Sequence, residues 1–238
     1  MTSFGTLYVC GTPIGNLSDI TLRALDVFRN VNIIAAEDTR RTRKLLSHYE
    51  ISTKTISYHE HNEFSRTPQL IEMLKEGKDI ALVTDAGMPG ISDPGSYLVN
   101  AALSNNVKVT SVPGPSAVAS ALSVSGFSAD KFVFFGFLPR KGKRRNKILG
   151  ALASETKVSV IYESPYRLLT TLSDLISTLG SDRKSVVTRE LTKLHEEVIK
   201  GTLGEILEVF SQRTVKGEIT IVIEGDVKKK GTNKMMVP

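Results

Sequence analysis

Three loops rich in glycine and proline are the segments best suited to bind a ligand. They span residues 11–15, 85–95 and 113–116, and each directly follows a run of apolar residues. Glycine lets a ligand approach the backbone closely, and proline stiffens a turn, so these loops suit main-chain recognition of a cofactor. Ordinary tight turns between a strand and a helix also need glycine, and they are the alternative interpretation of each loop.

The sequence narrows the class of cofactor. It contains neither the G-x-x-x-x-G-K-S/T pattern of ATP-hydrolysing enzymes nor the G-x-G-x-x-G fingerprint of dinucleotide-binding domains. These absences argue against ATP hydrolysis and ordinary NAD binding. Ligands that lack phosphates remain, such as S-adenosylmethionine (SAM).

Metal and nucleophilic chemistry have little support. Of the histidines His48, His59, His61 and His195, only those in residues 58–62 (Tyr-His-Glu-His-Asn) are spaced like metal ligands. The spacing fixes no third strong ligand there, which favours a polar loop over a metal site. The single cysteine, Cys10, and the absence of a G-x-S-x-G motif argue against cysteine metal sites and acyl transfer. We therefore expect no bound metal.

The elements that position these loops form an alternating pattern of short apolar runs and helix-length amphipathic segments. Such alternation is typical of strands joined by helices in a mostly parallel sheet. A capping box formed by Thr202 and Glu205 should open the helix at residues 203–210. Further helices are expected at residues 116–123, 143–153 and 168–179. The expected strands are residues 7–9, 33–36, 80–84, 107–112, 132–135, 158–162, 186–188, 198–199 and 219–223.

The length of 238 residues allows two modest domains. We expect an α/β fold with two α/β domains whose sheets are mostly parallel or mixed. The N-terminal domain should cover residues 1–118 and the C-terminal domain residues 119–226. Residues 227–238 should form a basic flexible tail.

Composition indicates where the protein works. Apolar residues make up 40% of the chain, but no eighteen of them occur in succession, and residues 1–15 do not resemble a secretion signal. A single cysteine fits a reducing compartment. We expect a cytoplasmic protein without a membrane partner.

The net charge of +6 is concentrated in clusters, which can attract polyanions. The alternative is that each cluster is only a solvated face. The residues expected to contact such a polyanion lie in two of these clusters and are Arg40, Arg41, Arg140, Lys141, Lys143, Arg144 and Arg145.

Seven motifs carry a resemblance to a known family. They occur at residues 11–17 (GTPIGNL), 36–40 (AEDTR), 84–95 (TDAGMPGISDPG), 112–117 (VPGPSA), 135–139 (FGFLP), 162–165 (YESP) and 188–193 (TRELTK). In this order they resemble the small-subunit ribosomal RNA 2′-O-methyltransferase I family, a branch of the tetrapyrrole methylase superfamily. The resemblance covers residues 5–225 approximately.

The resemblance implies a fold, a reaction and an assembly. It implies a tetrapyrrole-methylase-like fold with SAM in the cleft between two domains. It also implies methyl transfer to the ribose 2′-hydroxyl of a cytidine in the decoding region of small-subunit (16S) ribosomal RNA, on the RNA or the assembled subunit, by a homodimer. Matched by motif, the expected cofactor shell is Pro13, Asp85, Gly87, Met88, Ile91, Ser92, Ser116, Ala117 and Leu138.

Methyl transfer to a hydroxyl needs the hydroxyl oxygen in line with the methyl–sulfur bond of the donor, and it needs a nearby proton acceptor. Four carboxylates in the matched motifs are candidates: Glu37, Asp38, Glu163 and Glu190. Each has an arginine nearby in the sequence, so a structural ion pair is the alternative for each.

Two other functions remain open at this point. One is methylation of a tetrapyrrole or another small molecule by an enzyme of the same superfamily. The other is a non-catalytic RNA-binding module that reuses the fold. The basic clusters favour RNA over a small macrocycle as the partner.

Overall fold

Two compact α/β units make up the protein in a computed structural model that describes residues 4–226. The units divide between Ser116 and Ala117, two residues before the domain boundary expected from the sequence. We call them unit 1 and unit 2. The expected basic tail at residues 227–238 lies outside the described residues.

Unit 1 contains a five-stranded sheet in the order β3-β2-β4-β1-β5, and every neighbouring pair of strands is parallel. Its strands are β1 (Thr6–Cys10), β2 (Ile33–Ala36), β3 (Thr55–Ser57), β4 (Ile80–Val83) and β5 (Lys108–Val112). Its helices are η1 (Leu17–Asp19), α1 (Leu22–Asn30), α2 (Thr39–His48), α3 (Glu63–Lys75) and α4 (Ser96–Ser104). The edge strand β3 was not expected, because its short segment has a single apolar residue, Ile56.

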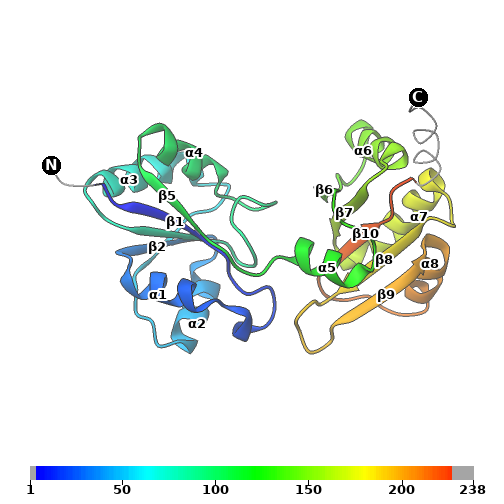
Figure 1. The fold of residues 1–238 in the computed structure, drawn as a ribbon, viewed down its shortest axis with the longest axis horizontal. Helices are drawn as coiled ribbons and strands as arrows, with labels where there is room; N and C mark the ends of the chain where they lie inside the picture. The colour runs from blue at the N-terminus through cyan, green and yellow to red at the C-terminus, as the bar shows by residue number, and fades with distance from the viewer. Residues whose placement is uncertain (1–3, 227–238) are drawn as a thin grey trace, which may run out of the picture. The chain divides into compact units, whose positions relative to one another are not determined.

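Helices cover both faces of the first sheet (Figure 1). On one face, Ile34 and Ala36 of β2 pack with side chains of α1 and α2. On the other face, Ile33 and Ala35 pack with side chains of α3 and α4. Every residue of β2 and β4 is buried, as expected for central strands of a parallel sheet.

Cys10 ends β1 inside the first of these cores. Its side chain is completely buried. Burial raises the pKa of the thiol to about 12, although Arg23 acts in the opposite direction. The thiol is therefore uncharged at neutral pH.

Unit 2 contains a mixed sheet in the order β6-β7-β10-β8-β9, in which only β6 and β7 are parallel neighbours. Its strands are β6 (Phe132–Phe137), β7 (Val158–Glu163), β8 (Lys184–Arg189), β9 (Glu197–Thr202) and β10 (Ile219–Ile223). Its helices are α5 (Ala117–Ser125), α6 (Lys143–Ser154), η2 (Pro165–Arg167), α7 (Leu168–Leu179) and α8 (Leu203–Ser211).

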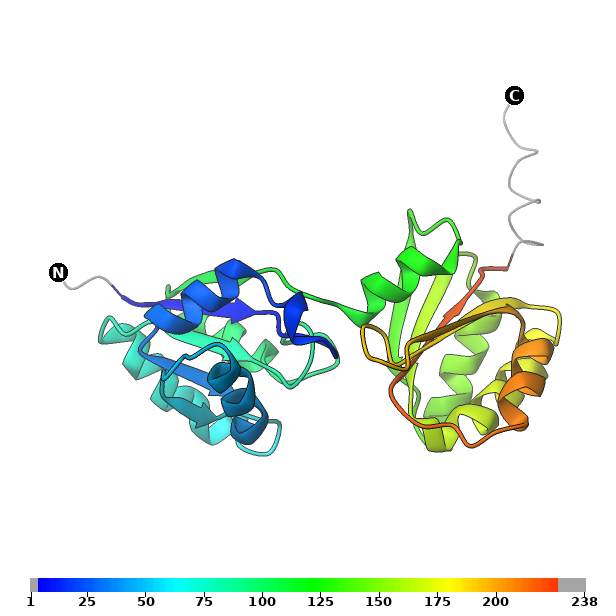
Figure 2. The ribbon, with the colours of Figure 1, turned by 90° about the horizontal axis from the view of Figure 1, so that it is seen from below.

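One face of the second sheet carries α6, α7 and α8, and the opposite face carries α5 (Figures 1 and 2). Leu149, Leu172 and Phe210 come from the three helices of the first face and share one apolar core. The expected capping box at the start of α8 is confirmed: Thr202 and Glu205 each accept a hydrogen bond from the other's backbone N–H. The predicted fold class, two α/β units with parallel and mixed sheets, is thus confirmed. No helix within residues 4–226 has the length and apolar character needed to cross a membrane.

Arg145 does not lie on the surface, and the expectation that it contacts RNA is corrected. It is 5% exposed. Its guanidinium donates to Asp174 Oδ2 at 2.8 Å, to the carbonyl oxygen of Pro139 at 2.9 Å and to Thr171 Oγ1 at 3.0 Å. The helical turn directs this one residue of the basic cluster inward, where it joins α6 to α7. Its neighbour Arg144 is exposed.

Arg145→Ala should lower the free energy of unfolding by about 3 kcal/mol, because it leaves buried acceptors without their donor. Arg144→Ala is the matched control and should change stability by less than about 0.5 kcal/mol. Urea denaturation followed by circular dichroism measures both. Equal stability of the two variants would contradict the structural role of Arg145.

Candidate functional site

The loops that follow β1, β4 and β5 meet at the carboxyl edge of the first sheet. Thr12 N donates to the carbonyl oxygen of Gly87 at 3.0 Å, and Gly87 N donates back to Thr12 O at 3.1 Å. Gly11 N donates to Val112 O at 3.1 Å, which joins the first loop to the end of β5, where the third loop begins. The ligand-binding loops expected from the sequence therefore touch one another within unit 1.

Glycine is required where the first and third loops cross. A Cβ atom added to Gly11 would lie 2.7 Å from the Cα atom of Gly114, and one added to Gly114 would lie 2.8 Å from the Cα of Gly11. Such distances are shorter than van der Waals contact, so neither position has room for a side chain. In the second loop, Gly87 has φ +84°, a conformation that favours glycine.

Two carboxylates join the ends of β2 and β4. Asp85 N donates to Glu37 Oε2 at 3.2 Å, and Asp38 N donates to Asp85 Oδ1 at 3.1 Å. The other carboxylate oxygen of Asp85, Oδ2, lies 3.2 Å from Nη1 of Arg41 on α2. The Asp85 carboxylate is thus held between the backbone of Asp38, which follows β2, and the side chain of Arg41 on α2.

Burial and the charges of neighbouring carboxylates raise the pKa of two carboxyl groups at these loops, those of Glu37 and Asp93. Partial burial and the neighbouring Asp85 charge raise the pKa of Glu37. Burial, followed by the charges of Glu37 and Asp85, raises the pKa of Asp93 to about 6. Asp93 is not among the site residues expected from the sequence. The signal was present, since Asp93 lies inside the longest glycine-rich loop, between Ser92 and Pro94.

The three other candidate proton acceptors are engaged in structural contacts. Asp38 caps α2 and pairs with Arg40 at 2.8 Å, and these hydrogen bonds hold the pKa of Asp38 below its usual range. Glu163 is buried and accepts hydrogen bonds from Thr171 Oγ1 at 2.6 Å and from Ser164 N at 2.7 Å. Asp38 and Glu163 are therefore better explained by a structural role than by proton acceptance.

Glu190 is engaged in the same way in unit 2. Burial favours its neutral form, but hydrogen bonds from Lys193 Nζ and from Glu218 N lower its pKa overall. A carboxylate with a lowered pKa is a weak proton acceptor. Of the four candidates, Glu37 alone lies at the glycine-rich loops and has a raised pKa.

The expected cofactor shell divides between the two units. Leu138, in unit 2, is 1% exposed and packs in the core, and its carbonyl oxygen accepts a hydrogen bond from Arg167 at 2.7 Å. The structure thus gives the Leu138 side chain a role in the core. Ala117 begins α5, also in unit 2. The members in unit 1 are Pro13, Asp85, Gly87, Met88, Ile91, Ser92 and Ser116.

The expected RNA-binding residues other than Arg145 are exposed. Arg40 and Arg41 lie on α2, where they pair with Asp38 and Asp85. The remaining members lie at or just before the start of α6 and are Arg140, Lys141, Lys143 and Arg144.

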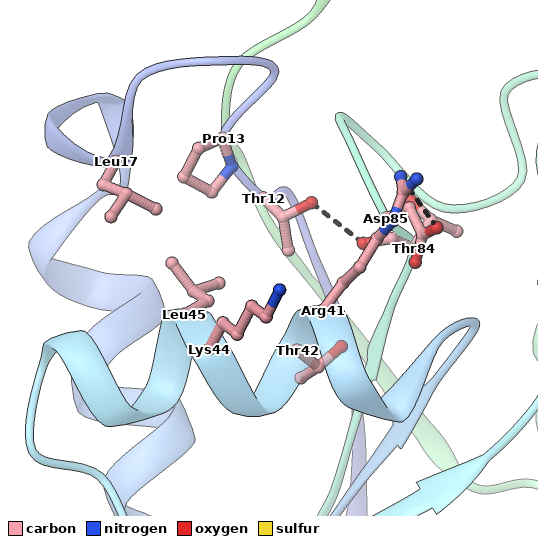
Figure 3. Close-up of a pocket in the computed structure, with 9 residues that line it drawn as sticks. All are labelled: Thr12, Pro13, Leu17, Arg41, Thr42, Lys44, Leu45, Thr84 and Asp85. Carbon is pink, nitrogen blue, oxygen red and sulfur yellow. Dashed lines mark hydrogen bonds and ion pairs between the residues drawn. The ribbon is translucent and has the colours of Figure 1, made fainter.

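A pocket of about 200 Å³ opens beside the loops, between the loop after β1 and helix α2 (Figure 3). Thr12 Oγ1 donates to the carbonyl oxygen of Thr84 at 3.0 Å across this region. The Thr84 hydroxyl is itself buried and has no hydrogen-bond partner. The pocket is lined by Thr12, Pro13, Leu17, Arg41, Thr42, Lys44, Leu45, Thr84 and Asp85.

These residues fit SAM better than they fit a metal. The loops bring backbone groups and carboxylates that complement a positively charged sulfonium into one region. Among residues 4–226, no three His, Cys, Asp or Glu side chains are grouped as metal ligands.

Comparison with known proteins agrees with this arrangement. The tetrapyrrole (corrin/porphyrin) methylase family matches residues 6–207. Two relatives carry the name ribosomal RNA small subunit methyltransferase I. The relative from Synechocystis sp. is 50% identical over 93% of this chain and 79% of its own length. The relative from Thermotoga maritima is 49% identical over 93% of this chain and 99% of its own length.

Solved structures show the same fold at low sequence identity. The methyltransferase CobJ is 16% identical, with a TM-score of 0.69 over 93% of this chain and 94% of that one. A uroporphyrin-III C-methyl transferase from Thermus thermophilus, complexed with S-adenyl homocysteine, is also 16% identical, with a TM-score of 0.65 over 95% of this chain and all of that one. The fold is thus that of a class of methyltransferases. The chain belongs to the tetrapyrrole methylase family and, within it, to the ribosomal RNA small subunit methyltransferase I group.

Asp93→Asn should stabilise the protein at high pH. The raised pKa means that the folded state keeps a proton that the unfolded state releases, so the contribution of Asp93 to stability is present below about pH 4 and lost as pH rises through about 6. Above about pH 7 the asparagine avoids the unfavourable charge, so the variant should be more stable than the wild type. The gain should be only about 1 kcal/mol, because solvent screens the charge of a half-exposed carboxyl.

Thermal unfolding of both proteins between pH 4 and pH 8 measures this difference. Asp130→Asn, at an exposed position in unit 2, is the matched control and should not change the pH dependence. A difference between Asp93→Asn and wild type that stays constant with pH would show that Asp93 titrates normally.

Proposed function

We propose that the protein transfers a methyl group from SAM to the 2′-hydroxyl of a cytidine ribose in the decoding region of small-subunit ribosomal RNA. The observation that carries this proposal is the sequence identity of 49–50% over 93% of the chain with proteins named ribosomal RNA small subunit methyltransferase I. The low-identity methyltransferase structures support the fold alone.

The residues of unit 1 supply binding, orientation and proton acceptance in this proposal. Bound SAM provides a methyl group on a positively charged sulfonium. The backbone of the three loops holds the cofactor, and Asp85, fixed by Asp38 N and Arg41, contributes negative charge beside it. Glu37 accepts the proton of the ribose hydroxyl, because it lies at the loops and its raised pKa makes it a stronger proton acceptor than an ordinary carboxylate.

The cellular setting follows from the substrate. The protein acts in the cytoplasm on small-subunit ribosomal RNA, or on the assembled small subunit, and no membrane partner is involved. Arg40, Arg41 and the exposed cations at residues 140–144 are the proposed contacts with RNA phosphates.

Incubation with methyl-labelled SAM tests the reaction. Small ribosomal subunits that lack the modification should become labelled at a cytidine 2′-oxygen, and a porphyrinogen should not. Asp85→Ala should bind SAM at least tenfold more weakly by calorimetry while remaining folded, because a fixed charge at the loops is lost. Label in the porphyrinogen would favour a small-molecule methyltransferase. RNA binding without transfer to any substrate would favour a non-catalytic module.

We also propose a homodimer, in line with the family resemblance. The chain mass is 26.0 kDa. Sedimentation velocity at micromolar concentration should give one species of twice that mass. A single species at the chain mass would contradict the dimer and leave the proposed reaction untouched.

A further inference from the structure

Lys44 has no partner in a helix whose other cations are engaged. Arg40 pairs with Asp38, Arg41 pairs with Asp85, and Arg43 donates to Thr55 Oγ1 at 3.1 Å. Within residues 4–226, the Lys44 ammonium makes no hydrogen bond or ion pair. Figure 3 shows it extending from α2 toward Thr12, and it lines the pocket there.

The pocket encloses a volume smaller than a whole cofactor and is open to solvent on one side. Its volume of about 200 Å³ is below the ~300–1,000 Å³ of pockets that enclose a complete small molecule. A pocket of this size takes one part of a larger ligand. The portion of the ligand that enters the pocket should place an anionic group beside the Lys44 ammonium and its less polar surface against the pocket walls.

The lining indicates what that part is. Pro13, Leu17 and Leu45 provide apolar walls, and the Thr84 hydroxyl is an unpaired hydrogen-bonding group. A sugar with its base can pack on apolar side chains and share a hydrogen bond with a hydroxyl. A phosphate at the mouth would neutralise the ammonium. One nucleotide of an RNA chain has all three features.

Charge favours RNA over SAM as the source of the anion. SAM has a carboxylate, but it also carries a positive sulfonium and a positive amino group. Lys44 and Arg43 are cations without a carboxylate partner, and they lie on the same helix as Arg40 and Arg41. The field of this helix therefore attracts a polyanion more strongly than it attracts SAM.

We propose that Lys44 and the pocket beside it form a subsite for one nucleotide of the RNA substrate, with the Lys44 ammonium bound to a backbone phosphate. The inference rests on the proposed function, because it names how that substrate is held. Lys44 acts here as a binding residue that fixes the register of the RNA on unit 1.

Lys44→Ala tests the subsite through the salt dependence of RNA binding. Loss of one phosphate contact should flatten the plot of log affinity against log salt by about 0.7 for single-stranded RNA. The KM for small ribosomal subunits should rise about threefold to tenfold, while kcat and the SAM dissociation constant stay unchanged. Lys44→Arg keeps the charge and should keep the wild-type slope.

Lys108→Ala is the matched control. Lys108 is also an exposed lysine of unit 1, but it lies at the amino end of β5, away from the loops. The Lys108→Ala variant should leave the salt dependence of RNA binding and the KM for small subunits unchanged. The probes are small-subunit ribosomal RNA for the salt titration and unmodified small subunits for the kinetics.

Two results would overturn the subsite. The first is a wild-type slope and KM in Lys44→Ala. The second is weaker SAM binding in Lys44→Ala with unchanged RNA affinity, which would assign the ammonium to the SAM carboxylate. Failure of the proposed function is distinguishable, since wild-type protein would then label no small subunits, while the salt slope would still report on Lys44.

Discussion

The close contact between Gly11 and Gly114 is the constraint on which the candidate site depends. It lets the loops after β1 and β5 cross at backbone distance, and the bridge between Thr12 and Gly87 adds the loop after β4. With the second loop fixed in this way, Asp85 reaches the backbone of Asp38 and the side chain of Arg41. Backbone packing therefore positions the charges, and the charges in turn define what the site can bind.

Negative and positive side chains lie in separate regions along the carboxyl edge of the first sheet. Glu37, Asp85 and Asp93 repel one another on the loop side, whereas α2 presents cations on its own side. The ion pair of Arg41 with Asp85 lies where the two regions meet. A positively charged methyl donor and a negatively charged polymer can thus be attracted to neighbouring parts of one unit, which brings donor and acceptor together.

Periodicity and motifs predicted most of the fold, because burial in α/β units imposes a regular apolar pattern. The central strands, the helices of unit 2 and the capping box at Thr202 followed from that pattern, whereas the edge strand β3 buries too little apolar surface to give a signal. The site was harder to predict. The state of a charged side chain depends on residues distant in sequence: Arg145 donates to Asp174, and the charge of Glu37 raises the pKa of Asp93. Charge counting cannot distinguish the buried Arg145 from the exposed Arg144.

The buried Cys10 has a practical consequence. With the pKa of the thiol raised to about 12 by burial, the reactive thiolate is scarce at pH 7, and the side chain is shielded from reagents. The chain has no other cysteine. A cysteine introduced at an exposed position would therefore be the one group that reacts with a maleimide or a spin label. The native protein is a ready background for fluorescence and distance spectroscopy, with no need to remove a cysteine first.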